Sequence, residues 1–278
     1  MFNLKKENGF IFKKAFGQNF LTDRKICEKI VAKAEIDSEI VVEIGPGSGI
    51  LTSELLKKAK KVVAIEKDKD LIPILKEKFK GQDRLILINE DFLKVNLKEI
   101  VCRNLKCSCF KICANLPYNI TSPIIIKILT ENLNIKSSTL MVQKEVANRI
   151  IATHKDKNYG SFSVFVRYYS EPEILFNVSR GSFFPIPKVD SAVVRLKKAA
   201  HPCEVENEEF FFKVVRASFS QRRKKVLNPL AEKFSILKSE IEKILERLSI
   251  EKNIRAEEIS LEQYIAISNL MLEFLNSR

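Results

Sequence analysis

Apolar residues in the first 200 positions of this 278-residue chain follow two patterns that alternate along the sequence. Short, nearly continuous apolar runs predict buried parallel strands, whereas apolar residues three or four positions apart predict helices. The expected strands cover residues 40–44, 61–66, 85–88, 110–114 and 139–142, and the expected helices cover residues 51–60, 71–79, 124–130 and 146–151. Strands that alternate with helices form right-handed βαβ units, so we expect an α/β fold with a mostly parallel sheet covered on both faces.

Three segments flank this alternating core. Residues 1–20 are basic and aromatic, so we expect an N-terminal arm, followed by a helix that starts near Thr22 and Asp23. Residues 161–176 and 192–196 are rich in β-forming residues. These two segments could form an antiparallel pair at the edge of the sheet.

The character of the sequence changes near residue 200. From residue 208 onward the pattern is helical, it contains no glycine, and Pro229 is its only proline. We therefore predict a first domain of residues 1–200 and a small all-α C-terminal domain of residues 201–278.

The formal net charge is +13, and it is unevenly distributed. Residues 1–200 carry 35 Lys and Arg against 22 Asp and Glu, whereas residues 201–278 carry 13 of each kind. A basic excess on one part of a protein attracts polyanions such as nucleic acids. The alternative interpretation is a lysine-rich proteome, in which the excess has no binding partner.

Hydropathy and the N-terminus indicate where the protein acts. No apolar run approaches the ~20 residues that a membrane-spanning helix needs. The N-terminus is polar within four residues and lacks the apolar stretch of a signal peptide. We therefore expect a cytoplasmic protein that does not bind membranes.

Four of the six cysteines, Cys102, Cys107, Cys109 and Cys113, lie close together. Disulfides are rare in the cytosol, and these spacings match none of the usual structural zinc patterns. Cys113 also falls in an expected buried strand. We therefore predict free thiols in the core or a loop, and no metal.

A glycine-rich loop, Glu43-Ile44-Gly45-Pro46-Gly47-Ser48-Gly49, follows the first expected strand and opens a helix. Glycines in such a turn allow unusual backbone conformations and let a ligand approach the main chain closely. Glu66 ends the next strand, 21 residues after Gly45. A carboxylate there accepts hydrogen bonds from both hydroxyls of a ribose, so the pattern predicts a nucleoside cofactor. The alternative is a structural turn beside surface carboxylates.

The choice of cofactor lies between a dinucleotide and S-adenosylmethionine. The dinucleotide fingerprint has its third glycine one position later, with a pyrophosphate over the helix N-terminus. Here Glu43 precedes the loop, and a carboxylate would repel a pyrophosphate but suits a sulfonium cation. Asp91, with Glu90 at the end of the third expected strand, is placed to accept the adenine amine. We therefore predict S-adenosylmethionine.

Asn115-Leu116-Pro117-Tyr118 ends the fourth expected strand, at the edge where doubly wound sheets carry their chemistry. The N6 amine of adenine is a poor nucleophile, and an enzyme can activate it by accepting hydrogen bonds from both N–H groups. The side-chain oxygen of Asn115 and the main-chain carbonyl of Leu116 are the predicted acceptors. The ring of Tyr118 offers a face on which the base can stack. A plain turn is the alternative for this motif in isolation.

Five motifs in order carry a resemblance to a known family. They are residues 16–21 (Phe-Gly-Gln-Asn-Phe-Leu), the Glu43–Gly47 loop, Asn115–Tyr118, residues 181–191 (Gly-Ser-Phe-Phe-Pro-Ile-Pro-Lys-Val-Asp-Ser) and residues 219–225 (Phe-Ser-Gln-Arg-Arg-Lys-Lys). From about Lys13 to Asn228 the chain resembles the KsgA family of small-subunit ribosomal RNA adenine dimethyltransferases, which is related to the Erm antibiotic-resistance methyltransferases. Phe184 and Ile186 vary the usual Phe-x-Pro-Pro-Pro run, and the cysteine cluster is not part of the family pattern.

The resemblance implies a Rossmann-like, S-adenosylmethionine-dependent methyltransferase domain followed by a small helical domain. The residues that it implies for cofactor binding are Asn19, Leu21, Gly45, Gly47, Glu66, Asp91 and Asn115. It implies that Phe183 packs against a flipped adenine opposite Tyr118. By itself Phe183 could equally be a core residue, although its proline-rich neighbourhood favours a loop. It also implies that two adjacent adenosines near the 3′ end of small-subunit RNA are each methylated twice, on immature small subunits. A monomer is the default expectation.

Arg222-Arg223-Lys224-Lys225 is a run of four cations on an expected helix. A bare charge run is usually a solvated face, but in an RNA enzyme it is a candidate for phosphate contact.

Three other functions remain open at this stage. One is an Erm-type methyltransferase of large-subunit RNA. Another is methylation of DNA adenine or of a protein glutamine amide, whose sites usually carry Pro-Pro-Tyr instead of Leu116-Pro117-Tyr118. The last is a ribosome-assembly factor that binds RNA, with catalysis secondary or lost.

Overall fold

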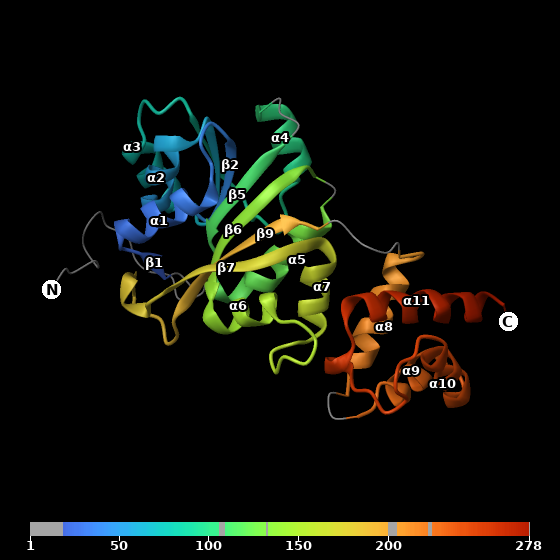
Figure 1. Cartoon of the computed structure of the whole chain (residues 1–278). Coiled ribbons are helices and arrows are strands. Elements are labelled where there is room, and N and C mark those ends of the chain that lie inside the picture. Colours follow the sequence, from blue (N-terminus) through green and yellow to red (C-terminus); the bar gives the residue numbers. More distant parts are fainter. Residues whose placement is uncertain (1–18, 106–108, 132, 200–204, 222–223, 278) are drawn as a thin grey trace. The chain divides into compact units, whose positions relative to one another are not determined.

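The computed structural model describes residues 19–277 except 106–108, 132, 200–204 and 222–223 (Figure 1). Most of the expected N-terminal arm, Arg222 and Arg223 therefore lie outside the described residues. Contacts divide the chain into two compact units. Unit 1 comprises Met1–Ala147 and Pro172–Lys198, and unit 2 comprises Asn148–Glu171 and Ala199–Arg278. The helical segment Asn148–Glu171 thus groups with the C-terminal residues by its contacts.

Unit 1 is built on a seven-stranded sheet. Its strands are β2 (Ile40–Ile44), β3 (Lys61–Glu66), β4 (Leu85–Asn89), β5 (Phe110–Asn115), β6 (Ile135–Gln143), β7 (Ser170–Val178) and β9 (Ser191–Lys198). They are ordered β4-β3-β2-β5-β6-β9-β7, with parallel pairing from β4 to β6 and antiparallel pairing of β6 with β9. The mostly parallel sheet predicted from the apolar runs is confirmed.

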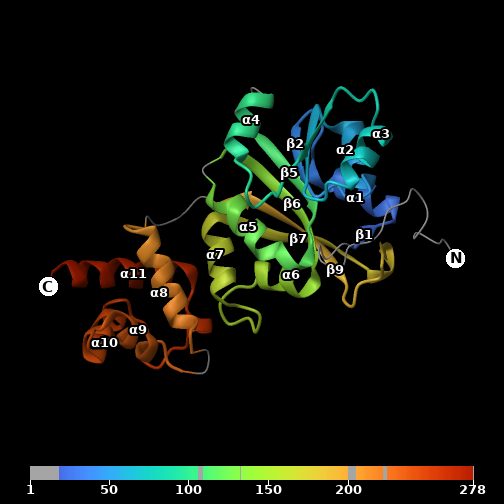
Figure 2. The ribbon, with the colours of Figure 1, turned by 180° about the vertical axis from the view of Figure 1, so that it is seen from behind.

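Helices alternate with the strands of this sheet, as expected (Figures 1 and 2). They are α1 (Arg24–Ala34), α2 (Ile50–Lys58), α3 (Leu71–Lys78), α4 (Leu97–Leu105), α5 (Thr121–Thr130) and α6 (Lys144–Ile151). Asp23 caps α1 by accepting a hydrogen bond from the Lys25 amide at 2.9 Å. The strand order runs outward from β2 in both directions, so right-handed crossovers place α2 and α3 on the opposite face of the sheet from α4 and α5. The carboxyl ends of β2 and β5 therefore diverge at a topological switch point, where such folds bind ligands.

Residues 161–176 differ from their predicted structure. They begin with helix α7 (Ser161–Tyr169), and only the following residues form β7. The sequence of α7 is rich in aromatic and β-branched residues, which favour strands. In unit 2, however, Val164 and Tyr168 are buried in one apolar cluster with Phe211 and Phe212. Burial on one helical face overrides the local strand propensity.

A two-stranded sheet joins distant parts of unit 1. In it, β1 (Phe20–Leu21) pairs antiparallel with β8 (Phe183–Phe184). The amide and hydroxyl of Thr22 both donate to the Ser182 carbonyl, at 2.9 and 3.1 Å. The segment just after the N-terminal arm is thereby fixed to the loop that precedes β9.

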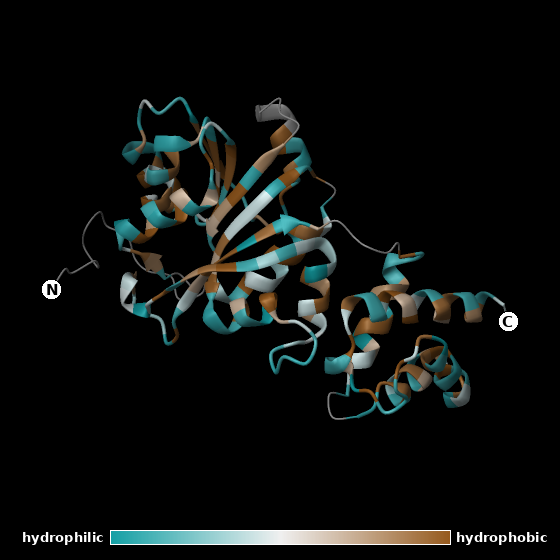
Figure 3. Cartoon of the chain, viewed as in Figure 1, coloured by the Kyte–Doolittle hydropathy of each residue, from teal (hydrophilic) through white to brown (hydrophobic). Residues whose placement is uncertain are grey.

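Unit 2 packs α7 with α8 (Glu208–Phe219), α9 (Leu227–Phe234), α10 (Lys238–Arg247) and α11 (Leu261–Asn276). Two buried tyrosines fix its loops: Tyr159 donates to the Ile259 carbonyl at 3.1 Å and Tyr264 to the Ala256 carbonyl at 2.9 Å. Figure 3 shows apolar positions alternating with polar ones along these helices and concentrated in the strands of unit 1. Within the described part of the chain, no helix is apolar over a length sufficient to cross a bilayer.

Candidate cofactor and amine site

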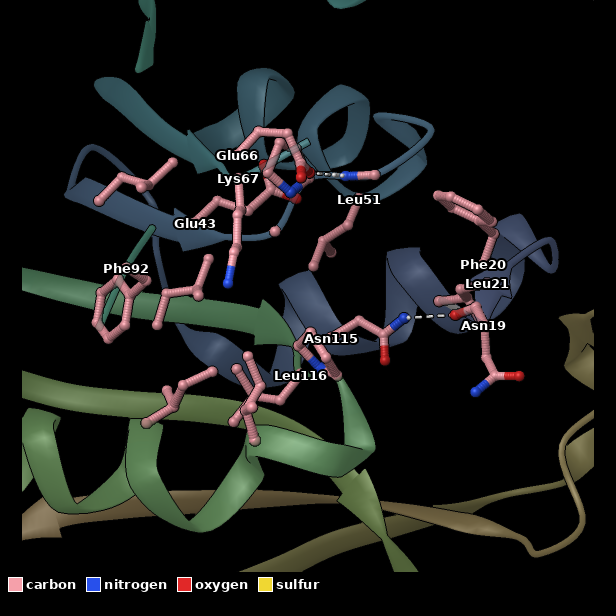
Figure 4. Close-up of a pocket in the computed structure, with 18 of the residues that line it drawn as sticks. Asn19, Phe20, Leu21, Glu43, Leu51, Glu66, Lys67, Phe92, Asn115 and Leu116 are labelled. Atoms are coloured by element: carbon pink, nitrogen blue, oxygen red, sulfur yellow. Dashed lines mark hydrogen bonds between the residues drawn. The ribbon is translucent and has the colours of Figure 1, made fainter. Parts of the chain in front are cut away.

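One pocket opens at the carboxyl ends of β2, β3, β4 and β5 (Figure 4). The cofactor residues implied by the resemblance all line it: Asn19, Leu21, Gly45, Gly47, Glu66, Asp91 and Asn115. Leu116 and Tyr118 of the predicted amine site line the same pocket. Sequence positions from five separate segments are thus brought to one place by the parallel strands.

The glycine loop shapes one wall of the pocket. The Gly45 amide donates to the Ile65 carbonyl at 2.9 Å, which continues the pairing of β2 with β3 into the loop. Gly45 has φ +66°, and a Cβ there would meet no atom within 4 Å, so the space beside it is open to a ligand. Gly47 has φ +57°, and a Cβ there would lie 2.8 Å from the ring of Phe20. The first glycine therefore leaves room for the cofactor, and the second leaves room for β1.

Glu66 is held rigidly at the end of β3. Its Oε2 accepts a hydrogen bond from the Gly47 amide at 3.1 Å, and its Oε1 accepts one from the Asp68 amide at 2.8 Å. Burial raises the pKa of Glu66, and the two amide donors oppose that shift. Each carboxylate oxygen has a second lone pair, so both can still accept a ribose hydroxyl.

Asp91, which follows β4, has a partner that the sequence did not predict. The Lys67 ammonium lies 2.8 Å from Asp91 Oδ2, and the Leu93 amide donates to Oδ1 at 3.0 Å. The bond from Lys67 is the main reason that the pKa of Asp91 is lowered. An ionised carboxylate is therefore available as an acceptor where an adenine amine is expected.

Asn115 is oriented by the segment before α1. Its Nδ2 donates to the Asn19 carbonyl at 3.3 Å, as Figure 4 shows. Because the amide nitrogen is bound in this way, the side-chain oxygen is the atom that remains to accept a hydrogen bond in the pocket. This is the orientation that amine activation requires.

Leu116 and Tyr118 are the other two residues of the predicted amine site. The Leu116 amide donates to the Met141 carbonyl at 3.1 Å, which fixes the main chain at the end of β5. A hydrogen bond of 2.6 Å joins the Tyr118 hydroxyl to Ser191 Oγ at the start of β9. Burial raises the pKa of Tyr118, so its phenol is neutral. The ring is thus positioned at both ends, by the turn and by β9.

Phe183 takes the core position that the sequence left open as an alternative. A loop was favoured, but Phe183 belongs to β8, pairs with Leu21 and is only 2% exposed. It is buried in the core of unit 1 and does not belong to the lining of the pocket. The proline-rich neighbourhood suggested a loop, and the pairing with β1, which joins segments far apart in the sequence, was not visible in the local pattern. Its contact with a target base remains a prediction.

Of the basic run, Lys224 and Lys225 are described, and both are exposed in unit 2. The Lys225 ammonium donates a hydrogen bond to the side-chain oxygen of Asn253, and the main chain of Lys225 forms an isolated β-bridge with Arg255.

Cys113 is buried in β5, as predicted. Over the described ranges no cluster of three or more His, Cys, Asp or Glu is arranged to hold a metal ion. The side chains of Cys102 and Cys107 lie outside those ranges.

Sequence reasoning missed several residues of the pocket. Phe20 packs over Gly47, Lys67 pairs with Asp91, and Phe92 lines the pocket beside them. Lys67 directly follows the predicted ribose carboxylate, so its position at a strand end was the one available signal. Thr52 does not line the pocket but donates a hydrogen bond to Glu43, and its place in a helix gave no signal of this contact.

The strand order, the glycine loop and the two acidic strand ends define an S-adenosylmethionine-dependent methyltransferase. The residues fit this cofactor, because the carboxylates of Glu66 and Asp91 line the pocket as acceptors suited to ribose hydroxyls and an adenine amine, and the space beside Gly45 is open. The sequence model for the family described as ribosomal RNA adenine dimethylase matches residues 9–273, and the chain belongs to this family. The resemblance drawn from the five motifs is confirmed.

Relatives and solved structures agree with this assignment. The chain is 44% identical over 273 residues to a ribosomal RNA small subunit methyltransferase A of Geobacillus sp. (strain WCH70), covering 96% of this chain and 94% of the relative. It is 45% identical over 268 residues to the protein of that name from Clostridium botulinum (strain Kyoto / Type A2), covering 96% of each. A dimethyladenosine transferase from Plasmodium falciparum has a similar structure, with TM-score 0.75 and 30% identity over 92% of this chain and 98% of that one. The 23S rRNA methyltransferase ErmE gives TM-score 0.68 and 29% identity over 90% and 98%.

Proposed function

We propose that this enzyme transfers methyl groups from S-adenosylmethionine to N6 of two adjacent adenosines near the 3′ end of small-subunit ribosomal RNA, twice on each. The observation that carries the proposal is the orientation of Asn115, whose amide nitrogen is bound to the Asn19 carbonyl beside the cofactor loop. An amide oxygen fixed in this way is an acceptor for an exocyclic amine.

The chain's own residues provide binding, orientation and charge stabilisation. When bound, the cofactor supplies an electrophilic methyl group on a sulfonium. The Asn115 oxygen and the Leu116 carbonyl accept the two N–H groups of adenine N6, so that its lone pair faces the methyl group and growing positive charge is stabilised. The Tyr118 ring stacks on the base, which contributes about 1–3 kcal/mol. A base must leave its stack to reach such a pocket, and loop or single-stranded RNA lowers that cost.

The small subunit is favoured over the large subunit as substrate. Relatives at 44–45% identity over nearly the whole chain are named small subunit methyltransferases, whereas the similar 23S enzyme is 29% identical. Methylation of large-subunit RNA is the second candidate, because that enzyme shares the fold over 90% of this chain.

The test uses purified protein, labelled S-adenosylmethionine and ribosomal subunits that lack the modification. Small subunits should yield N6,N6-dimethyladenosine after digestion of the RNA, and large subunits should yield none. Label found only in the large subunit would support the second candidate. Asn115→Ala should abolish transfer. A protein with this substitution that still binds immature small subunits would show an added role in assembly.

We expect RNA methylation to take place in the cytoplasm, with the enzyme acting as a monomer.

A further inference from the structure

Glu43 is a carboxyl group with an unusual position. It is the fourth residue of β2, directly before the glycine loop, and it lines the pocket although only 1% of it is exposed. In Figure 4 it lies beneath the end of the pocket that Glu66 and Lys67 form. A carboxylate so far from water is costly unless charge or hydrogen bonds compensate for it.

The groups around Glu43 compensate only in part. Thr52 of α2 donates a hydrogen bond to Glu43 Oε2 at 2.7 Å. The other titratable groups that face Glu43 come from four elements: Cys27 of α1, Glu66 of β3, Lys78 of α3 and Cys113 of β5. The charge of Glu66 disfavours a negative charge on Glu43. The two thiols offer no positive charge that could pair with it. The Lys78 ammonium is the opposing charge, but it is bonded to the Ser48 carbonyl at 2.8 Å.

Burial consequently raises the pKa of Glu43 to about 8, with Glu66 adding to the shift and Thr52 and Lys78 reducing it. In the free protein near pH 7, Glu43 is therefore mostly neutral. A cation placed in the pocket would reverse this balance, because an opposite charge at short range favours the ionised carboxylate.

We propose that Glu43 releases its proton to solvent when S-adenosylmethionine binds and takes one up again when the bound ligand becomes the neutral thioether S-adenosylhomocysteine. The proposal rests on the proposed function for its choice of cofactor. Both ligands carry the same ribose, adenine and amino acid, and they differ at the sulfur by one methyl group and one positive charge. The ionised Glu43 would therefore bind the methyl donor more strongly than the product and assist exchange between successive transfers.

The coupling between ligand binding and loss of the Glu43 proton predicts how affinity changes with pH. Since the ionised form binds the donor, affinity for S-adenosylmethionine should increase with pH up to about 8 and then level off. The increase should approach about ten-fold per pH unit below that value, as for any binding step coupled to loss of one proton. Affinity for S-adenosylhomocysteine should change much less.

Calorimetric titration of the full-length protein without RNA measures this directly. At pH 7, each ligand is titrated in two buffers that differ in ionisation enthalpy, which gives the number of protons released on binding. S-adenosylmethionine should release about one proton more than S-adenosylhomocysteine from Glu43, and its preference over the product should rise by roughly ten-fold or more between about pH 6.5 and about pH 8.5. Equal proton release for the two ligands would overturn the proposal.

Two variants identify the group. In Glu43→Gln the difference in proton release should vanish and the ratio of dissociation constants should become independent of pH, which also separates Glu43 from the ligands' own amino groups. Glu66→Gln is the matched control, because it changes a neighbouring buried carboxyl that faces groups common to both ligands. It should weaken both ligands and keep a difference in proton release, although a smaller one, because Glu66 no longer raises the pKa of Glu43.

Thermal unfolding shows whether Glu43→Gln is folded. A third variant tests the proposal if it is not. Thr52→Val removes the donor to Glu43 and should raise the pH at which the affinity levels off, without abolishing the linkage. If the wild type binds neither ligand, the proposed function fails. If it binds both with the same proton release, only the role of Glu43 fails.

Discussion

At the scale of single residues, two polar side chains of the pocket are bonded to the scaffold and still have oxygen lone pairs that can accept hydrogen bonds from a ligand. Asn115 uses its nitrogen on the Asn19 carbonyl, and Glu66 uses one lone pair of each oxygen on the amides of Gly47 and Asp68. Such bonds remove rotational freedom before the ligand arrives, which reduces the entropic cost of binding.

Glu66→Ala should weaken binding of S-adenosylmethionine by roughly ten-fold or more. Two ribose hydroxyls lose their acceptor, and the Gly47 amide loses its partner, at about 1–3 kcal/mol for a buried group left unpaired. Titration calorimetry measures the dissociation constant. Glu54→Gln is the control, because Glu54 is also buried but pairs with Arg24 and Lys57 away from the pocket. The assignment of Glu66 would be wrong if its replacement left the affinity unchanged.

At the scale of elements, the short strand β1 connects the cofactor loop with the loop that carries the predicted base contact. Phe20 packs over Gly47, while its neighbour Leu21 pairs with Phe183. A two-stranded sheet of this size is too small to be stable alone. Its place depends on its packing against the glycine loop and the core of unit 1.

Gly47→Ala should displace β1 and reduce cofactor affinity several-fold. The added Cβ would lie 2.8 Å from Phe20 at φ +57°. Gly81→Ala is the matched control: φ is +79° there but no atom lies within 4 Å, so it carries the backbone strain of about 1 kcal/mol without the collision. Both proteins are compared by thermal unfolding and by cofactor binding. Equal affinity in the two variants would show that the position of β1 does not matter to the cofactor.

Phe183 has both a core position and a predicted contact with the target base, and two substitutions separate these roles. Phe183→Ala should lower the free energy of unfolding by about 3–5 kcal/mol, because the ring is buried. Phe183→Leu should keep most of the stability, since it retains most of the apolar volume. If the ring also stacks on adenine, Phe183→Leu should raise KM for RNA or lower kcat while the cofactor dissociation constant stays constant. Normal kinetics with Phe183→Leu would assign the ring to the core alone.

At the scale of the whole molecule, the candidate cofactor pocket belongs to unit 1, and the basic run belongs to the helical unit 2. Unit 2 includes Asn148–Glu171 as well as the C-terminal residues, because α7 shares its apolar core. Recognition of a large RNA particle by such a protein would draw on phosphate contacts that carry no sequence information.

A double variant, Arg222→Gln with Arg223→Gln, should bind small subunits more weakly. The slope of the logarithm of the binding constant against the logarithm of salt concentration should become less steep by about 2, because two phosphates would no longer be neutralised. The matched control is Lys213→Gln with Lys243→Gln, which removes the same charge from unit 2 but from lysines paired with Glu209 and Glu240. Filter binding at several salt concentrations gives both slopes. A basic run that is only a solvated face would give the same slope as the control.

The sequence by itself determined the parallel sheet, the glycine loop and the acidic strand ends, because each depends on local pattern: apolar runs, positive-φ glycines and residues at fixed positions after a strand. The carboxyl ends of parallel strands meet at one edge, so the glycine loop, Glu66, Asp91 and Asn115 could be placed together without knowing any contact. Asn19 and Leu21 followed only from the family resemblance.

Only the tertiary structure decided the pairing of β1 with β8, the burial of Phe183, the helical form of α7 and the Lys67–Asp91 ion pair. These depend on contacts between residues far apart in sequence, whose energies exceed local preferences. The same holds for Glu43, whose residue type was plain from the sequence but whose protonation follows from the exclusion of water around it.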